Sequence, residues 1–248
     1  MYNKEDFEKI AQTNLSNKNQ VKANALLLEN LILKSAAKIG NDTKRHLYDP
    51  GLLSKLQLLY ETFETNLEID FAQDIIQGKK TIKDYLLTKR FITLIRNEVK
   101  LGKMTKNDKV LFIGCGPFPI SAILFNQFVG CHIDCYEKRK YRANLANKVL
   151  AKLDLSDTIK VIHKKGETIS DDKYNTVVIA LLAKPKDKIL DRIYRMVKPH
   201  TRIVCRTSDS ENKVFYEDTN EKLLKKYHTE YKVPATGDQT ISSILLVK

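Results

Sequence analysis

Apolar residues in the first hundred positions recur at helical spacing, in two stripes that each predict a helix. The first stripe contains Val21, Ala25, Leu28, Ile32 and Ile39, and the second contains Leu52, Leu56, Leu59, Phe63, Leu67, Phe71 and Ile75. A third helix is predicted over 81–101. The polar segment NDTKRHLYDPG at 41–51 is interpreted as the connection between the first two helices. Residues 1–104 are therefore predicted to form a helical domain.

From about Asp108 the pattern changes to short β-branched runs that alternate with helical stretches. Strands are predicted over 109–113, 131–136, 159–163, 175–182, 202–206, 228–233 and 242–247. Helices are predicted over 117–128, 139–153, 186–197 and 217–226. Strands that alternate with helices are typical of a mostly parallel sheet covered on both faces. The fold class is therefore α/β, with a doubly wound, mostly parallel sheet of Rossmann type over 105–248.

Composition excludes several classes of protein. No apolar run approaches the roughly 20 residues that cross a bilayer, and the charged N-terminus MYNKEDFEKI lacks the apolar core of a signal peptide. The four cysteines stand singly in the sequence, and the five histidines show no metal-binding spacing. We therefore expect a cytoplasmic protein without a disulfide framework, a metal site or a membrane partner.

The formal net charge is +13, from 43 basic and 30 acidic residues. Such a charge suits a nucleic-acid partner through phosphate contacts, and it equally suits a lysine-rich surface that keeps the protein in solution. The basic residues are spread along the whole chain, with no run of five. Nucleic acid is kept as an alternative partner and is not favoured.

The segment VLFIGCGPFP at 110–119 is an apolar strand that runs into a glycine turn. In an open parallel sheet, ligands bind beyond the carboxyl ends of the strands. Gly114 and Gly116 let the backbone approach such a ligand, and Pro117 suits the first turn of a helix. The turn is therefore a predicted binding site for a nucleotide-like molecule.

The second predicted strand ends in Glu137, about twenty residues after the turn, where a carboxylate can accept hydrogen bonds from both hydroxyls of a ribose. The third glycine of a dinucleotide fingerprint is missing, because Pro119 and Ile120 stand there. The combination predicts adenosine without a pyrophosphate, as in S-adenosylmethionine (SAM). A purely structural turn with a solvated Glu137 is the alternative.

The chain resembles the nicotianamine synthase family, which includes bacterial aminobutanoyltransferases that make opine-type metallophores. GCGPFP matches the family's G-x-G-P-x-P turn, and residues 174–217 look like its fourth-strand to fifth-strand segment, with Arg206 and Tyr216 in matching places. LEIDFAQDI at 67–75 and FITLIRNE at 91–98 resemble two segments of the family's helical domain. Phe91 stands where the family has a tyrosine. The resemblance covers roughly residues 60–217.

The resemblance implies a SAM-methyltransferase-like fold and transfer of SAM's 3-amino-3-carboxypropyl (aminobutanoyl) group to an amine of a small acceptor such as an amino acid. The other product would be methylthioadenosine, and the pathway would be metallophore biosynthesis. A homodimer is the expected assembly. Residues 1–104 would form a lid over the SAM pocket. The residues expected to bind SAM are Gly114, Cys115, Gly116, Pro117, Glu137, Leu181, Leu182 and Arg206.

Transfer of this group requires an anchor for SAM's carboxylate and a base for the acceptor amine. Arg206 is the candidate anchor, with a salt bridge at the rim as its alternative role. Glu61, Glu64 and Glu68 form one stripe on the helix predicted over 52–76, and the resemblance implies Glu68 as base or anchor. A solvated stripe facing lysines is the alternative. The remaining catalytic candidates, as assistants of the base, are Glu64, Tyr85 and Tyr216.

Three other functions remain open. SAM's own amine could attack its γ-carbon and form azetidine-2-carboxylate. A SAM-dependent methyltransferase acting on RNA or a small molecule would suit the charge of +13, but LLAKPKD at 181–187 lacks the Asn/Asp-Pro-Pro-aromatic motif of many amine methyltransferases. A binding module without catalysis is the third.

Overall fold

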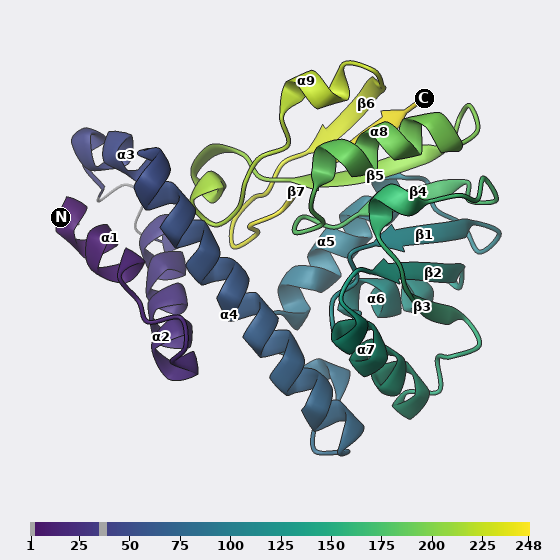
Figure 1. Cartoon of the computed structure of the whole chain (residues 1–248), viewed down its shortest axis with the longest axis horizontal. Helices are drawn as coiled ribbons and strands as arrows, with labels where there is room; N and C mark the ends of the chain where they lie inside the picture. The colour runs from purple at the N-terminus through teal and green to yellow at the C-terminus, as the bar shows by residue number, and fades with distance from the viewer. Residues whose placement is uncertain (1–2, 35–38) are drawn as a thin grey trace.

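A computed structural model describes residues 3–34 and 39–248, and a long helix crosses from a helical bundle to an α/β sheet domain (Figure 1). The predicted apolar stripe from Val21 to Ile39 includes residues 35–38, which lie outside the described residues. The helices of the first hundred residues are α1 (Lys4–Ala11), α2 (Lys18–Glu29), α3 (Asn41–Leu47), α4 (Pro50–Ile76) and α5 (Thr88–Leu101). A π-helical turn over Asn30–Lys34 extends α2, and a 3₁₀ turn over Ile82–Asp84 precedes α5.

The polar segment 41–51 is not a plain connection, because it contains helix α3. Only Leu47 of this helix is buried, so it has no apolar stripe to reveal it. Charge favours the helix instead, with Asp42 in its first turn and three basic residues in its last. Helix α4 then begins at Pro50, where the Asp49 side chain accepts the N–H groups of Gly51 and Leu52.

Seven strands form one sheet in the order β3-β2-β1-β4-β5-β7-β6. Their bounds are β1 (Lys109–Ile113), β2 (His132–Glu137), β3 (Ile159–His163), β4 (Thr176–Ile179), β5 (Arg202–Thr207), β6 (His228–Val233) and β7 (Ser242–Val247). Strand β7 runs antiparallel to both of its neighbours, β5 and β6, and the other neighbouring pairs of this sheet are parallel. The prediction of a mostly parallel sheet is confirmed, and each of the seven predicted strands is present.

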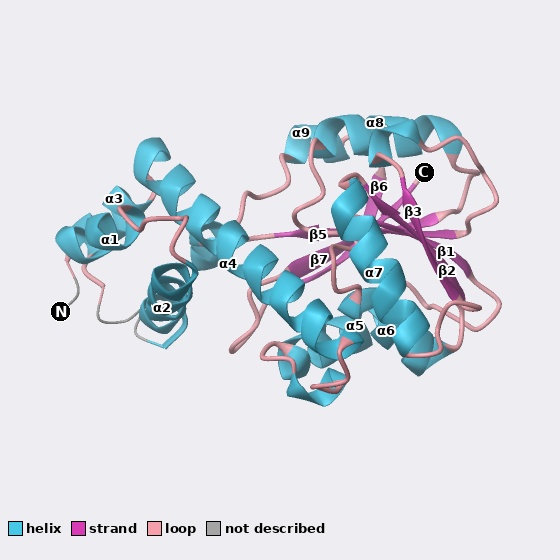
Figure 2. Cartoon of the chain, turned by 60° about the horizontal axis from the view of Figure 1, so that its bottom comes forward, coloured by secondary structure: helices cyan, strands magenta, loops and turns pink. Residues whose placement is uncertain are grey.

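Helices cover both faces of the sheet, as the doubly wound prediction requires. Helices α5, α6 (Ile120–Val129) and α7 (Lys140–Lys152) lie on one face, and α8 (Lys186–Met196) and α9 (Glu221–Leu224) lie on the other (Figure 2). Helix α6 begins at Ile120, so the prediction that Pro117 occupies its first turn is wrong. The residue before a proline avoids the helical region, and Phe118 precedes Pro119.

The buried apolar residues form two clusters, and α4 contributes to both. Phe71 and Ile75, near the end of α4, pack with α5 and the sheet. Leu56 and Phe63, nearer its start, pack with α1, α2 and residues 214–216. The division of the chain at residue 104 stays a prediction, since the cluster around the sheet includes residues on both sides of it.

A buried ion pair joins α5 to the sheet below the end of β5. The Arg206 side chain donates from Nε and Nη2 to the two carboxylate oxygens of Glu98, at 2.9 and 2.8 Å. Its Nη1 donates to Ser121 on α6 at 3.0 Å, and Ser243 on β7 donates to Glu98 at 2.6 Å. Glu98 is 0% exposed and Arg206 is 3% exposed, so neither charge has water to replace its partner.

We expect Glu98→Ala to lower the free energy of unfolding by about 3–5 kcal/mol, because it leaves the Arg206 charge buried and unpaired. Urea unfolding followed by circular dichroism measures this change. The control is Glu230→Ala on the exposed strand β6, for which a change within about 0.5 kcal/mol is expected. Similar losses for both variants would contradict the importance of the pair.

Candidate active site

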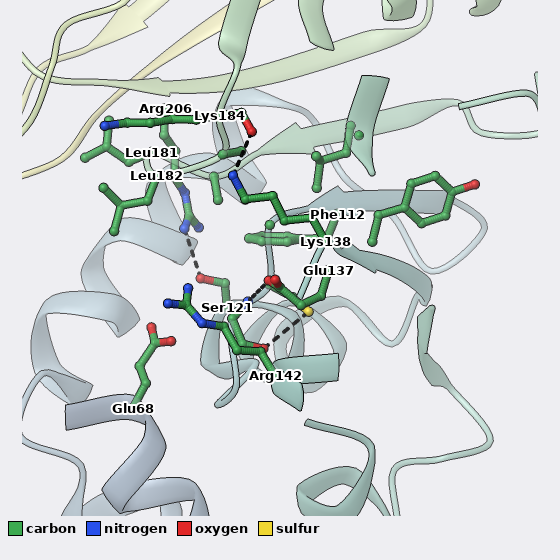
Figure 3. A pocket seen from close by; sticks show the side chains of 18 of the residues that line it. Glu68, Phe112, Ser121, Glu137, Lys138, Arg142, Leu181, Leu182, Lys184 and Arg206 are labelled. Atoms are coloured by element: carbon green, nitrogen blue, oxygen red, sulfur yellow. Dashed lines mark hydrogen bonds between the residues drawn. The ribbon is translucent and has the colours of Figure 1, made fainter. Parts of the chain in front are cut away.

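An open pocket lies beyond the carboxyl ends of β1, β2 and β4. Strands β1 and β4 are neighbours, and the chain continues from them in opposite directions across the sheet, so this is its topological switch point. The pocket residues come from α4, α6, α7 and the strand ends (Figure 3). The predicted site residues among those lining it are Glu64, Glu68, Gly114, Cys115, Gly116, Glu137, Leu181, Leu182 and Arg206.

Both glycines of the turn have a positive φ, +85° at Gly114 and +71° at Gly116. A Cβ atom on Gly116 would lie 2.3 Å from Oε2 of Glu68, so the Glu68 side chain reaches the turn and would have to move if this residue were not glycine. Cys115 between them is buried, and a hydrogen bond with Cys135 together with burial raises the pKa of its thiol. The turn therefore presents its backbone groups and a neutral thiol to a ligand.

Glu137 ends β2 and is 4% exposed. Its Oε2 accepts the N–H of Gly116 at 3.2 Å, and its Oε1 accepts the N–H of Arg139 at 2.9 Å. These two bonds orient the carboxylate, and each oxygen keeps a further lone pair for a ligand. The location suits the predicted bonds to two ribose hydroxyls.

Leu181 and Leu182 follow β4 and form the opposite wall of the pocket. The position of this loop is set by Lys186 at the start of α8, whose Nζ donates to the carbonyl oxygens of Leu181 at 3.0 Å and Arg206 at 2.8 Å. Burial lowers the pKa of Lys186. This lysine therefore ties the end of β4 to the end of β5, which the sequence did not reveal.

Arg206 reaches the pocket from β5, but most of its hydrogen-bonding capacity is used inside the protein. Three of its N–H groups bind Glu98 and Ser121, and its guanidinium lies 5.2 Å from the ring centre of Phe112. It forms a buried ion pair and not a salt bridge at the rim. The predicted role as a carboxylate anchor would use the N–H groups that remain.

The acidic stripe on α4 divides into two environments. Glu61 lies toward the solvent and pairs with Lys184 at 3.5 Å. Glu64 and Glu68 line the pocket, where Glu64 accepts a hydrogen bond of 2.7 Å from the Tyr216 hydroxyl. Among the described residues, no side chain or backbone group makes a hydrogen bond or an ion pair with the Glu68 carboxylate. Helix α4 thus places one oriented and one unpartnered carboxylate beside the turn.

Desolvation raises the pKa of both carboxyl groups. It raises the pKa of Glu64 to about 7, although the hydrogen bond from Tyr216 and the charge of Arg90 act in the opposite direction. The pKa of Glu68 lies well above its ordinary value because of desolvation and then the neighbouring Glu64. A carboxyl group with such a pKa can exchange a proton with an amine near neutral pH.

Three predicted residues lie behind the lining of the pocket. Pro117 is buried in the turn. The ring of Tyr216 packs 5.2 Å from that of Tyr60, and its hydroxyl reaches the site only through Glu64. Tyr85 packs against Phe118, which lines the pocket, and its buried hydroxyl has no partner in the part of the chain that the structure describes.

The pocket also contains residues that sequence reasoning missed, namely Phe112, Phe118, Ser121, Lys138, Arg142 and Lys164. Lys138 directly follows Glu137, and Arg142 lies five residues after Glu137 in the first turn of α7, so both stand near a residue that was predicted. Ser121 gave no signal because its role depends on Arg206, far away in the sequence.

Within residues 3–34 and 39–248, no group of three or more metal-binding side chains occurs. No helix there has the length and apolar character to cross a membrane.

The chain is similar to several known proteins. It is 25% identical over 132 residues to the L-histidine 2-aminobutanoyltransferase of Yersinia pestis, a match that covers 53% of this chain and 49% of that protein. The chain thus matches about half the length of this curated relative. A solved structure of an MtNAS mutant in complex with S-adenosylmethionine is 24% identical, with a TM-score of 0.87 and coverage of 98% of this chain and 97% of that one.

A second structure, MtNAS in complex with MTA and tNA, is 23% identical with a TM-score of 0.86, and the match covers 98% of this chain and 97% of that one. An RNA methyltransferase from Salinibacter ruber in complex with S-adenosyl-L-homocysteine reaches a TM-score of 0.51 at 13% identity, over 62% of this chain and 90% of that one. These structures confirm the predicted SAM-methyltransferase-like fold. The nicotianamine synthase protein family matches residues 9–248, and the chain therefore belongs to the nicotianamine synthase family.

Proposed function

We propose that this protein transfers the 3-amino-3-carboxypropyl (aminobutanoyl) group of SAM to an amine of an amino acid or a similar small acceptor and releases methylthioadenosine. The observation that carries the proposal is the pair of carboxylates, Glu64 and Glu68, that α4 places beside the glycine turn. An amine acceptor must lose a proton before it attacks, and these groups have pKa values raised by desolvation. The activity named for the Yersinia pestis relative agrees with the proposal.

SAM is the proposed co-substrate, without a metal. Its ribose would bind Glu137, and its sulfonium arm would pass Cys115 and Gly116 toward the loop at Leu181 and Leu182. The remaining N–H groups of Arg206 would hold the carboxylate of that arm. Pro117 would support the turn from behind.

In the proposed reaction the acceptor ammonium first gives a proton to Glu68. The amine nitrogen then forms a bond to the γ-carbon of SAM, and the bond between that carbon and sulfur breaks. The electron pair stays on sulfur, so the sulfonium becomes the neutral thioether of methylthioadenosine. Tyr216 would orient Glu64, and Tyr85 would offer its unpartnered hydroxyl to the site from behind Phe118.

Residues 1–104 would act as the lid that excludes water from this reaction. We also propose a cytoplasmic location and a homodimer and, on the strength of the family, a role in metallophore biosynthesis. Nucleic acid is not the favoured partner. The net charge of +13 is its main support, while the pocket suits a small acceptor.

The products decide between this function and its alternatives. Purified protein is incubated with SAM, alone and with each proteinogenic amino acid, and the adenosyl product is identified by mass spectrometry. We expect methylthioadenosine that depends on an added acceptor. Methylthioadenosine without an acceptor, together with azetidine-2-carboxylate, would select cyclisation. S-adenosylhomocysteine as the sole adenosyl product would contradict the proposal in favour of a methyltransferase.

We expect Glu68→Gln to lower kcat by about 10²–10⁴-fold, because the amide cannot take the proton of the acceptor ammonium. The rate of methylthioadenosine release at saturating substrates measures the effect. Asp70→Asn is the matched control, since Asp70 is exposed on the same helix and pairs with Lys18 at the surface. A Glu68→Gln enzyme as fast as this control would exclude Glu68 as the base.

The raised pKa of Glu64 also predicts how stability depends on pH. Between its ordinary pKa of 4.5 and its folded-state value of about 7, the folded protein binds more protons than the unfolded chain. Its contribution to the free energy of unfolding is therefore full below pH 4.5 and is lost as the pH rises through 7. We expect Glu64→Gln to reduce this decline and to be more stable than the wild type at pH 8, as measured by urea unfolding across the pH range. An unchanged slope would contradict the assignment.

A further inference from the structure

Five cationic side chains line the pocket, and most of them already have partners within the protein. The four with partners are Arg206 with Glu98, Lys184 with Glu61 and Glu217, Lys138 with the carbonyl of Lys184, and Lys164 with Tyr136 and Ser170. Arg142 is the fifth. Within residues 3–34 and 39–248, its half-buried guanidinium makes no hydrogen bond and no ion pair.

The side chains of Arg142 and Glu68 point toward one another within the pocket from different helices (Figure 3). Arg142 lies in the first turns of α7, and Glu68 lies on α4, which packs along α7. The charge of Arg142 is close enough to act on the pKa of Glu68, yet the two groups form no ion pair. An arginine and a carboxylate that merely neutralised one another would close into a bidentate contact. Here each group keeps its binding capacity for a ligand.

Two opposite charges held apart in one pocket match a molecule that carries both. We propose that Arg142 and Glu68 together bind the zwitterionic end of an α-amino acid, with its carboxylate at the Arg142 guanidinium and its ammonium at Glu68. This inference rests on the proposed function and adds a residue that selects the acceptor. It makes amino acids better acceptors than the corresponding amines without a carboxylate.

The proposed reaction brings two carboxylates into the pocket, one on SAM and one on an amino-acid acceptor, and the pocket offers two guanidinium groups. Arg206 lies at the end of β5, near the loop that follows β4. Arg142 lies beside Glu68, the proposed base for the acceptor. We therefore assign the Arg142 site to the acceptor. In a cyclising enzyme the same two groups would hold the amino-acid end of SAM itself.

The test compares wild type, Arg142→Met and Arg142→Lys, with Lys148→Met as the control because Lys148 is exposed on the same helix and does not line the pocket. Methylthioadenosine release is measured with L-histidine and with histamine, and then with other amino acids beside their decarboxylated amines. For each, KM is determined for the acceptor and for SAM. Circular dichroism checks that the variants fold, and the lysine variant keeps the charge if the methionine variant does not fold.

We expect Arg142→Met to lower kcat/KM for the best amino-acid acceptor by about 10–100-fold, as is typical for a lost hydrogen-bonded charge pair. The change should lie in the KM of the acceptor, and the decarboxylated amine should be affected less than about twofold. The lysine variant should be intermediate, because it keeps the charge and loses the bidentate geometry. A rise in the KM of SAM, with slower release of methylthioadenosine in the absence of acceptor, would assign the zwitterion to SAM.

Unchanged KM values for both substrates, or equal losses with the amino acid and its decarboxylated amine, would overturn the inference. Failure of the proposed function has a different signature, because the wild type itself would then release no methylthioadenosine. In that case calorimetric titration of the wild type and of Arg142→Met with L-histidine and with histamine still tests Arg142. A preference of the wild type for L-histidine over histamine that Arg142→Met retains would refute a carboxylate contact at this residue.

Discussion

The buried ion pair between Glu98 and Arg206 is the constraint on which the pocket depends. Through Ser121 and Ser243 it joins α5, α6, β5 and β7 at the level where the strands end. A charge buried without its partner is costly, so these four elements keep one relative arrangement. Phe112 packs on the Arg206 guanidinium and also lines the pocket, so the ion pair helps to fix the position of part of the pocket wall.

Helix α4 supplies the two desolvated carboxyl groups of the pocket, Glu64 and Glu68. It belongs to both apolar clusters, and its packing brings Glu68 so close to the glycine turn that a side chain at Gly116 would collide with it. The same covering removes water from Glu64 and Glu68 and raises their pKa values. Desolvated carboxylates reduce the stability of the fold at neutral pH, and they are the groups that can take a proton from an amine there. Helix α4 therefore belongs to the proposed lid and also carries the proposed base.

Much of the fold was predictable because its signals are local. The β-branched runs, the glycine turn and Glu137 lie within single elements, and each strand was found within a few residues. Helix α3 was missed because charges at its ends, and not an apolar stripe, mark it. The helix predicted over 217–226 is shorter in the structure, where it spans Glu221–Leu224. The third helix, predicted from residue 81, begins at Thr88. In these short polar segments, the ends of a helix depend on tertiary packing as much as on the local amino-acid composition.

The sequence by itself determined the alternation of strands and helices, the turn at Gly114–Gly116 and the family resemblance, since each depends on neighbouring residues. Only the tertiary structure decided which charges are free. The sequence suggested Arg206 as an open anchor, but Glu98 occupies most of its hydrogen-bonding capacity. Arg142 gave no signal in the sequence, yet it lies in the pocket with Glu68 and has no partner among the residues that the structure describes. The physical reason is that a charge is satisfied or left available by groups far away in the chain, and their distances are set by how α4, α5 and α7 pack on the sheet.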